Sequence, residues 1–223
     1  MLKAIVFDLD DTLYDYQALH NKAMNVLSKY VGEHFGVDAE QFRSAWADAR
    51  EETKQAQGNT AASHNRMLYC QKTLEKLELP PAYGALEMYE AYWGYILAQM
   101  SLREGVAELL TDCKERGIKI GICSDLTAHI QHCKLQALGI AAQIDCLVTS
   151  EEAGVEKPDP QIFQMILKKL KCAPSEVLYI GDNLERDIYG AAACGISALW
   201  LTRNKGDNAV KNFWEVRKWL KWA

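Results

Sequence analysis

Residues 7–15 read FDLDDTLYD, and this stretch decides how the rest of the chain is interpreted. It overlaps a short apolar, β-branched run at 3–8 that ends abruptly in acid, as expected of a buried β-strand. Asp8, Asp10 and Asp11 place three carboxylates within four residues. Carboxylates held so close beside a buried strand repel one another and are costly to keep together without a cation. The pattern therefore predicts a functional site at the end of the first strand.

Similar apolar runs return in the second half of the chain, at 118–124, 144–149, 177–181 and 196–201. Stretches of helical character lie between these runs, at 126–138, 160–171 and 184–194. Near-continuous apolar strands separated by helices indicate a parallel sheet that is covered on both faces. We therefore expect an α/β fold with a three-layer, Rossmann-like core around a mainly parallel five-stranded sheet.

Residues 15–100 differ in sequence pattern from the rest of the chain and contain no convincing strand. Helical patterns run at about 17–31, 39–57, 62–78 and 82–99. Because this segment interrupts the chain between the first strand and its sheet partners, it predicts an inserted α-helical bundle domain. The α/β core is then formed by residues 1–14 and 101–223.

Composition narrows the classes of partner. The 223 residues carry a net charge of −5 with no basic block, so nucleic acid is not expected as a partner, since phosphate affinity depends on clustered cations. The longest apolar runs are far shorter than the ~20 residues of a membrane span. The tail NFWEVRKWLKWA, with Trp214, Trp219 and Trp222, fits either a membrane-surface helix or a helix packed on the sheet, and we favour packing and no membrane partner.

The cysteines and the N-terminus indicate a compartment. The chain has seven scattered cysteines and no C-x-x-C pair, so neither a disulfide framework nor a zinc site is suggested. The N-terminal residues form a predicted strand that is followed directly by aspartates, which is unlike a signal peptide. We expect buried thiols in a reducing, cytoplasmic environment. The oligomeric state is left open.

Reactive side chains gather at four predicted strand ends or in the loops that follow: Asp8 with Asp10, Ser124, Lys157, and Asp182 with Asp187. In an open parallel sheet, ligands bind beyond the carboxyl ends of the strands. A cluster of carboxylates suggests a bound metal, and all-oxygen ligation favours Mg²⁺. A hydroxyl and an ammonium beside the ion complete a cradle for a phosphoryl group.

The spacing of Asp8 and Asp10 suggests that the two carboxylates have different chemical roles. In extended geometry, residues two apart point the same way. One carboxylate is then placed to attack phosphorus, while its neighbour handles the proton of the leaving group.

FDLDDTLYD, Ser124, Lys157 and GDNLERD (181–187), in this order and at strand ends, resemble the motifs of the haloacid dehalogenase (HAD) superfamily. The resemblance covers about 1–14 and 101–202, and the insertion resembles the four-helix cap of many members. It implies that Asp8 is the nucleophile, forming an aspartyl-phosphate. It implies that Asp10 protonates the leaving alcohol and activates water. Ser124 and Lys157 would hold the phosphoryl oxygens, and Thr12 would belong to the same phosphate-binding set and orient Asp10.

The resemblance also implies the metal ligands: Asp8, the backbone carbonyl of Asp10, Asp182, and Asp187 supporting the metal or Lys157. It places the first strand between those ending in Ser124 and Asp182. True dehalogenases lack an acid at the position of Asp10, which argues for phosphate chemistry. Relatives often carry Asn where this chain has Asp125, a carboxylate whose role is left open.

The function that we predict is a Mg²⁺-dependent phosphatase, acting on a small phosphorylated metabolite such as a sugar phosphate or nucleoside monophosphate. One alternative is a phosphotransferase or phosphomutase on the same core, although the mutases carry Gly where Asp11 stands. Another is a non-catalytic phospho-acceptor protein, as in receiver domains. His64, Asn65 and Arg66 are candidates for contacting the distal end of a substrate, with a surface position as the alternative.

Overall fold

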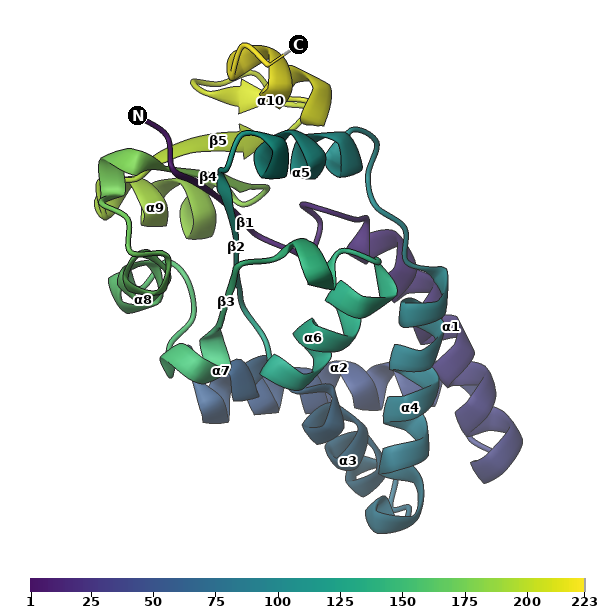
Figure 1. Ribbon diagram of the computed structural model, residues 1–223. Helices are drawn as coiled ribbons and strands as arrows, with labels where there is room; N and C mark the ends of the chain where they lie inside the picture. Colours follow the sequence, from purple (N-terminus) through teal and green to yellow (C-terminus); the bar gives the residue numbers. More distant parts are fainter. Residues whose placement is uncertain (223) are drawn as a thin grey trace. The chain divides into compact units, whose positions relative to one another are not determined.

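The computed structural model describes residues 1–222, which divide into two compact units (Figure 1). One unit comprises Met1–Asp15 and the chain from Ser101 onward. The other comprises Tyr16–Met100. The chain leaves the first unit after residue 15 and returns to it at residue 101, so the second unit is an insertion.

The first unit is built on a parallel sheet of six strands, in the order β3-β2-β1-β4-β5-β6. The strands are β1 (Ala4–Phe7), β2 (Lys119–Ser124), β3 (Cys146–Thr149), β4 (Val177–Gly181), β5 (Ser197–Leu201) and β6 (Ala209–Val210). The first strand is expected between those ending in Ser124 and Asp182, and it does lie between β2 and β4, although β4 ends one residue earlier, at Gly181. The expected number of five strands is wrong by one. The sixth strand has two residues, too few to leave an apolar run in the sequence.

Helices cover both faces of this sheet, with α8 and α9 on one side and α5 and α6 on the other (Figure 1). The helices of this unit are α5 (Val106–Glu115), α6 (Ala128–Ala137), α7 (Ser150–Ala153), α8 (Pro160–Leu170), α9 (Gly190–Ala193) and α10 (Phe213–Trp219). Two short 3₁₀ turns (Ala141–Gln143 and Pro174–Glu176) and a π-helical turn, η4 (Leu184–Tyr189), complete the unit. The α/β, Rossmann-like class expected from the sequence is confirmed.

The central strand β1 is buried on both faces, which explains its unbroken apolar sequence. Ala4 and Val6 belong to the core cluster that includes Phe163 of α8. Phe7, whose side chain points to the opposite face, has its ring centroid 6.3 Å from that of Phe213 in α10. Two buried layers therefore hold β1 in place, and with it the acidic residues that follow.

The C-terminal helix α10 packs through Phe213 and Val216, which are buried. Trp214 and Trp219 are 40% and 50% exposed. The expected packing of this helix is thus made by Phe213 and Val216, with Trp214 and Trp219 left largely exposed. None of the helices formed by residues 1–222 is long and apolar enough to cross a membrane.

The Tyr16–Met100 unit holds four α-helices: α1 (Tyr16–Phe35), α2 (Ala39–Gln57), α3 (Arg66–Lys76) and α4 (Pro81–Gln99). Asp38 caps α2 by accepting hydrogen bonds from two backbone N–H groups at 2.9 Å, and Pro81 occupies the first turn of α4. The helix expected at 62–78 is divided. A 3₁₀ turn, η1 (Ala61–His64), precedes it, because Asn65 caps a new helix through the Met67 N–H.

Candidate active site

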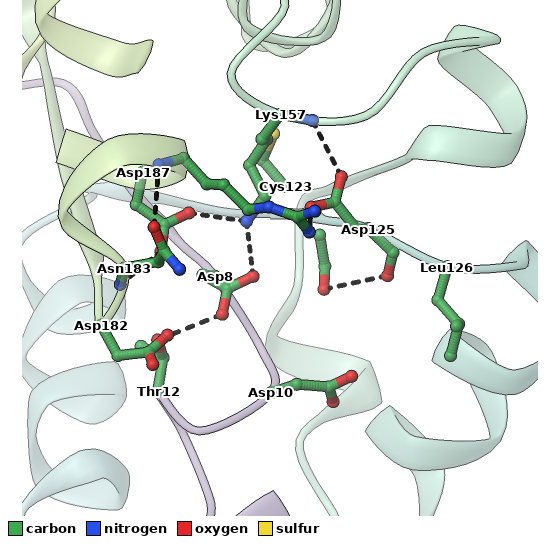
Figure 2. Close-up of polar contacts among 12 residues, drawn as sticks. Asp8, Asp10, Thr12, Cys123, Asp125, Leu126, Lys157, Asp182, Asn183 and Asp187 are labelled. Carbon is green, nitrogen blue, oxygen red and sulfur yellow. Dashed lines mark hydrogen bonds and ion pairs between the residues drawn. The ribbon is translucent and has the colours of Figure 1, made fainter. Parts of the chain in front are cut away.

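Parallel register brings the predicted strand-end residues to one edge of the sheet. Phe7, the last residue of β1, pairs with Ile122 of β2 and with Ile180 of β4. Asp8 therefore emerges between the end of β2 and the end of β4, and its backbone N–H still donates to the Ile180 carbonyl at 2.9 Å. Figure 2 shows the side chains that converge around it.

The Asp8 carboxylate is held on both of its oxygens, and its side chain is only 7% exposed. Lys157 Nζ donates to Oδ1 at 2.7 Å, and the Thr12 hydroxyl lies 3.2 Å from Oδ2. Thr12 also lies 3.3 Å from Asp182 Oδ1, so its single proton serves one carboxylate or the other. Thr12 thus contacts Asp8 and Asp182, whereas the family resemblance implied that it orients Asp10. These bonds fix the direction in which Asp8 presents its oxygens.

Lys157 is buried, and it joins Asp8 to a second carboxylate. Its ammonium nitrogen lies 2.6 Å from Asp187 Oδ1 and 3.3 Å from the Tyr179 hydroxyl oxygen. Burial lowers the pKa of Lys157, but the attraction of Asp187 and Asp8 outweighs burial and leaves this pKa well above the ordinary value. The ammonium therefore keeps its charge inside the site.

One lysine does not balance the three carboxylates around it. Oxygens of Asp8, Asp182 and Asp187 all lie within 4.8 Å of one another. Burial raises the pKa of Asp8 well above its ordinary value, and repulsion from Asp187 and Asp182 adds to this rise. Burial also raises the pKa of Asp182 to about 6, with repulsion from Asp187 and Asp11 as further causes. Excess buried negative charge on oxygen ligands is the environment that suits a hard divalent cation.

Asp10 lies outside this cluster and has partners of its own. Lys134 Nζ donates to both carboxylate oxygens at 2.7 Å, and the Tyr14 hydroxyl donates to Oδ1 at 2.6 Å. Lys134 comes from α6 and its side chain is fully buried, while the Asp10 side chain is 26% exposed. The two carboxylates of the D-x-D motif therefore differ in environment: Asp8 belongs to the cluster of three carboxylates, whereas Asp10 is paired with the Lys134 ammonium.

Ser124 and Asp125 close the β2 side of the site. The Ser124 hydroxyl accepts a hydrogen bond from Gln131 Nε2 at 2.8 Å. Asp125 accepts from the Lys157 backbone N–H at 3.0 Å and pairs with Arg186 at 3.3 Å. The extra carboxylate at position 125 is therefore an anchor for the Lys157 loop and for the turn that carries Arg186.

The turn after β4 presses Asp187 against the strand. Asn183 caps the π-helical turn η4 through two backbone N–H groups, and its own N–H donates to Asp187 Oδ2 at 3.0 Å. The Asp187 carboxyl group lies over Gly181, where a β-carbon would overlap it. Only glycine fits this position without moving Asp187.

Comparison with known proteins agrees with this arrangement. The family model described as haloacid dehalogenase-like hydrolase matches residues 2–195, most of the chain. The chain belongs to the haloacid dehalogenase-like hydrolases. The resemblance inferred from the motifs of the sequence is therefore confirmed.

Two relatives of this hydrolase align over nearly its whole length. Ribulose-1,5-bisphosphate 5-phosphatase of Halopiger xanaduensis is 37% identical over 95% of this chain and 90% of its own. Glyceraldehyde 3-phosphate phosphatase of Pyrococcus abyssi is 32% identical over 92% and 83%. Among solved structures, a HAD phosphatase from Thermococcus onnurineus superposes with a TM-score of 0.73 at 23% identity, covering 98% of each chain.

Sequence reasoning did not identify Lys134, Tyr179 or Gln131 as part of this hydrolase's site. Lys134 reads as an ordinary helical lysine, and Tyr179 as one more apolar strand residue. The Tyr179 hydroxyl donates to the Cys123 carbonyl at 2.9 Å and lies 3.1 Å from Asp187 Oδ1. Gln131 is fully buried, and its Oε1 has no hydrogen-bond partner among the residues described. Long side chains that reach the site from the middle of a helix or strand leave no local signature.

Proposed function

We propose that this hydrolase removes the phosphoryl group from a small phosphate monoester of the sugar phosphate class through an aspartyl-phosphate on Asp8. The observation that carries the proposal is the Asp8 carboxylate, held by Lys157 and Thr12 at the carboxyl edge of the sheet. Relatives over 30% identical are named as phosphatases of ribulose bisphosphate and of glyceraldehyde 3-phosphate, which supports both the reaction and the substrate class. The enzyme is a phosphoric monoester hydrolase.

In the first half of the reaction, an Asp8 oxygen attacks phosphorus and the bond from phosphorus to the ester oxygen breaks. Asp10 gives its proton to the departing alkoxide, which leaves as an alcohol. Lys157 and Ser124 contact the phosphoryl oxygens, with Lys157 neutralising charge as it develops. Thr12 holds the attacking carboxylate in place from its other oxygen.

In the second half, Asp10 accepts a proton from water, whose oxygen attacks the same phosphorus. The bond between phosphorus and the Asp8 oxygen breaks, inorganic phosphate leaves, and the Asp8 carboxylate is restored. Proton balance is kept because Asp10 gains from water the proton that it gave to the alcohol. Lys134 and Tyr14 orient Asp10 for both tasks.

Mg²⁺ is the ion that we assign to the carboxylate cluster, because all the donors are oxygen. Asp8, the Asp10 backbone carbonyl and Asp182 are its proposed ligands, and Asp187, which accepts a hydrogen bond from Lys157, would support the ion. When bound, the ion offsets the negative charge of the carboxylates and of the phosphoryl group. The raised pKa values of Asp8 and Asp182 support this assignment, since a cation would lower both.

We assign residues 15–100 to a cap domain that excludes bulk water and selects the leaving group. The size of this insertion suits a small molecule better than a phosphoprotein. The compartment that we propose is the cytoplasm, supported by seven free cysteines. Thiol titration of the freshly isolated, unfolded protein tests the compartment: fewer than seven reactive thiols would count against it.

The experiment that tests the function is phosphate release from a panel of sugar phosphates, nucleoside monophosphates and a phosphoserine peptide. We expect turnover with Mg²⁺, none with excess chelator, and the highest kcat/KM among sugar phosphates. Asp8→Asn, which keeps the shape of the side chain, should lose turnover while remaining folded by circular dichroism. Full turnover by Asp8→Asn would show that Asp8 is not the nucleophile.

Two other outcomes point to different functions. Phosphoryl transfer to a second sugar hydroxyl without release of phosphate would identify a phosphotransferase. A single stoichiometric phosphorylation without turnover would identify a phospho-acceptor protein.

A further inference from the structure

A glutamine of helix α6 reaches the part of the site where β2 ends. Gln131 is fully buried and lies one helical turn before Lys134, which is also fully buried and bonds to Asp10. Residues three apart lie on the same face of a helix, so one face of α6 carries both side chains toward the carboxyl edge of the sheet. The proposed reaction uses Lys134 through Asp10 but gives Gln131 no role.

The side-chain amide of Gln131 is fixed in orientation by two acceptors. Its Nε2 donates to the Asp125 carbonyl at 2.7 Å and to the Ser124 hydroxyl oxygen at 2.8 Å. A backbone carbonyl can only accept hydrogen bonds, so the amide nitrogen, and not the amide oxygen, must face it. The NH₂ group has two protons, and each of them has an acceptor here. The Ser124 oxygen is therefore the acceptor in its bond with Gln131.

The proton of the Ser124 hydroxyl has no good acceptor within the protein. Among the described residues, its acceptor is the Asp125 carbonyl at 3.4 Å, which is beyond the usual range of an O–H···O hydrogen bond. The same carbonyl receives the much shorter bond from Gln131. Gln131 thus competes with Ser124 for this carbonyl, and the Ser124 proton is left for a stronger acceptor, such as a charged phosphoryl oxygen.

The other end of the amide shows that Gln131 is not placed for stability. Gln131 Oε1 is buried and has no hydrogen-bond partner among the described residues. A buried acceptor without a partner destabilises a fold, so its presence calls for an explanation. A methionine of similar length would fill the space without an unpaired atom. Glutamine at this position therefore fits a role in directing a proton better than a role in packing.

We propose that Gln131 is a positioning residue for phosphoryl transfer. By donating to the Asp125 carbonyl and to the Ser124 oxygen, it makes the Ser124 proton point to a phosphoryl oxygen of the substrate. This inference rests on the proposed function, in which Ser124 contacts the phosphoryl oxygens. Gln131 acts through Ser124 and does not itself contact the substrate. A neutral amide suits this task, because it adds no buried charge beside the carboxylates of the site.

Gln131→Met removes both donated bonds and keeps the length of the side chain. The Ser124 hydroxyl should then turn to the freed Asp125 carbonyl, and kcat/KM for phosphate release should fall by about 10-fold. The midpoint of urea unfolding should change little, because the variant loses two hydrogen bonds but also loses the unpaired oxygen. Gln136→Met, at an exposed position of the same helix, is the matched control and should keep full activity.

Gln131→Glu changes the donors at this position without changing the size of the side chain. A carboxyl group carries at most one proton, so it cannot donate to Ser124 and to the Asp125 carbonyl together. In either protonation state, the Ser124 proton is drawn to the carboxyl group or to the freed carbonyl. We expect kcat/KM to fall by about 100-fold. Wild-type kcat/KM in either folded variant of Gln131 would overturn the inference.

A double-mutant cycle separates this role from a structural one. Ser124→Ala should lower kcat/KM by about 10- to 100-fold, and adding Gln131→Met should lower it further by less than about threefold. The second change has little effect because no Ser124 proton remains to be directed. An equal loss from Gln131→Met with and without Ser124 would show that Gln131 only supports the fold, which overturns the inference. Absence of phosphate release by the wild-type enzyme from every substrate of the panel would instead defeat the proposed function.

Discussion

The ammonium of Lys134 lies 2.7 Å from both carboxylate oxygens of Asp10, although 124 residues separate the two in the chain. Lys134 is fully buried, so this residue of α6 places an ammonium group that is shielded from water beside Asp10, the proposed acid and base. A group that gives and receives a proton in alternate steps must stay in one orientation throughout. This pairing explains why the two aspartates of one short motif have separate surroundings.

Replacement of Lys134 tests this role. Lys134→Met keeps the length of the side chain but leaves Asp10 without its ammonium. We expect kcat to fall by about 100-fold while KM changes by only a few-fold. Lys134→Arg should recover part of kcat. The measurement is steady-state phosphate release by folded variants, and an unchanged kcat in Lys134→Met would remove Lys134 from the mechanism.

Gly181→Ala tests how tightly the turn after β4 is built. A β-carbon at this position overlaps the Asp187 carboxyl group, so Asp187 must move away from Lys157. We expect a loss of about 10- to 100-fold in kcat/KM. We also expect weaker Mg²⁺ binding, so that a metal titration reaches half-maximal activity at a higher Mg²⁺ concentration. Gly94→Ala is the control, because nothing lies within 4 Å of its new β-carbon in helix α4. It should raise the free energy of unfolding by about 0.5–1 kcal/mol. Full activity in Gly181→Ala contradicts the account of Asp187.

Tyr179→Phe removes a hydroxyl that joins three parts of the site. This hydroxyl donates to the Cys123 carbonyl, lies 3.1 Å from Asp187 Oδ1 and receives from Lys157. Its loss leaves the carbonyl unpaired, and we expect the free energy of unfolding to fall by about 1–3 kcal/mol in urea denaturation. A modest decrease in kcat should accompany this, because Lys157 keeps both of its carboxylates. Unfolding at the wild-type urea concentration would show that the hydroxyl is dispensable.

The stability of the protein should depend on pH through His20. Its pKa is lowered from 6.5 to about 4 in the folded state, first by burial and then by Arg66 and Arg50. Between these values the unfolded chain binds a proton that the folded chain does not, so the free energy of unfolding decreases as the pH falls from 6.5 toward 4. Because the ring is partly solvated, we expect about 1–2 kcal/mol from this group.

His20→Gln isolates that contribution. Urea unfolding of both proteins at pH 7 and pH 5 should show a smaller loss of stability in the variant. Identical pH dependence would mean that His20 titrates normally in the folded protein.

The sequence predicts the residues whose signal is local. Asp8, Asp182 and Ser124 stand where an apolar run ends, and parallel pairing then necessarily brings them to one edge. The order of the central strands follows from the motifs in the same way. Boundaries are less well predicted, as when Asn65 divides one expected helix because its side chain caps a new start.

Other features depend on contacts between residues that are far apart in the chain, and no short stretch of sequence shows these contacts. Lys134 is buried because α6 lies over the site, and nothing in AHIQHCKLQA distinguishes it from a solvated lysine. The bond from Thr12 to Asp182 spans 170 residues. Asp125 likewise acquires its role as an anchor from Arg186, which follows a different strand. These contacts are products of the tertiary fold.

If Asp8 carries the phosphoryl group during turnover, that group can be trapped on it. Asp10→Asn should form the intermediate from an aryl phosphate, whose leaving group needs no proton, but hydrolyse it slowly. After acid quench and peptide mass analysis, we expect one phosphoryl group on Asp8, formed with Mg²⁺ and absent with chelator. A phosphoryl group on another residue, or turnover by Asp8→Asn without any covalent intermediate, would show that Asp8 is not the nucleophile.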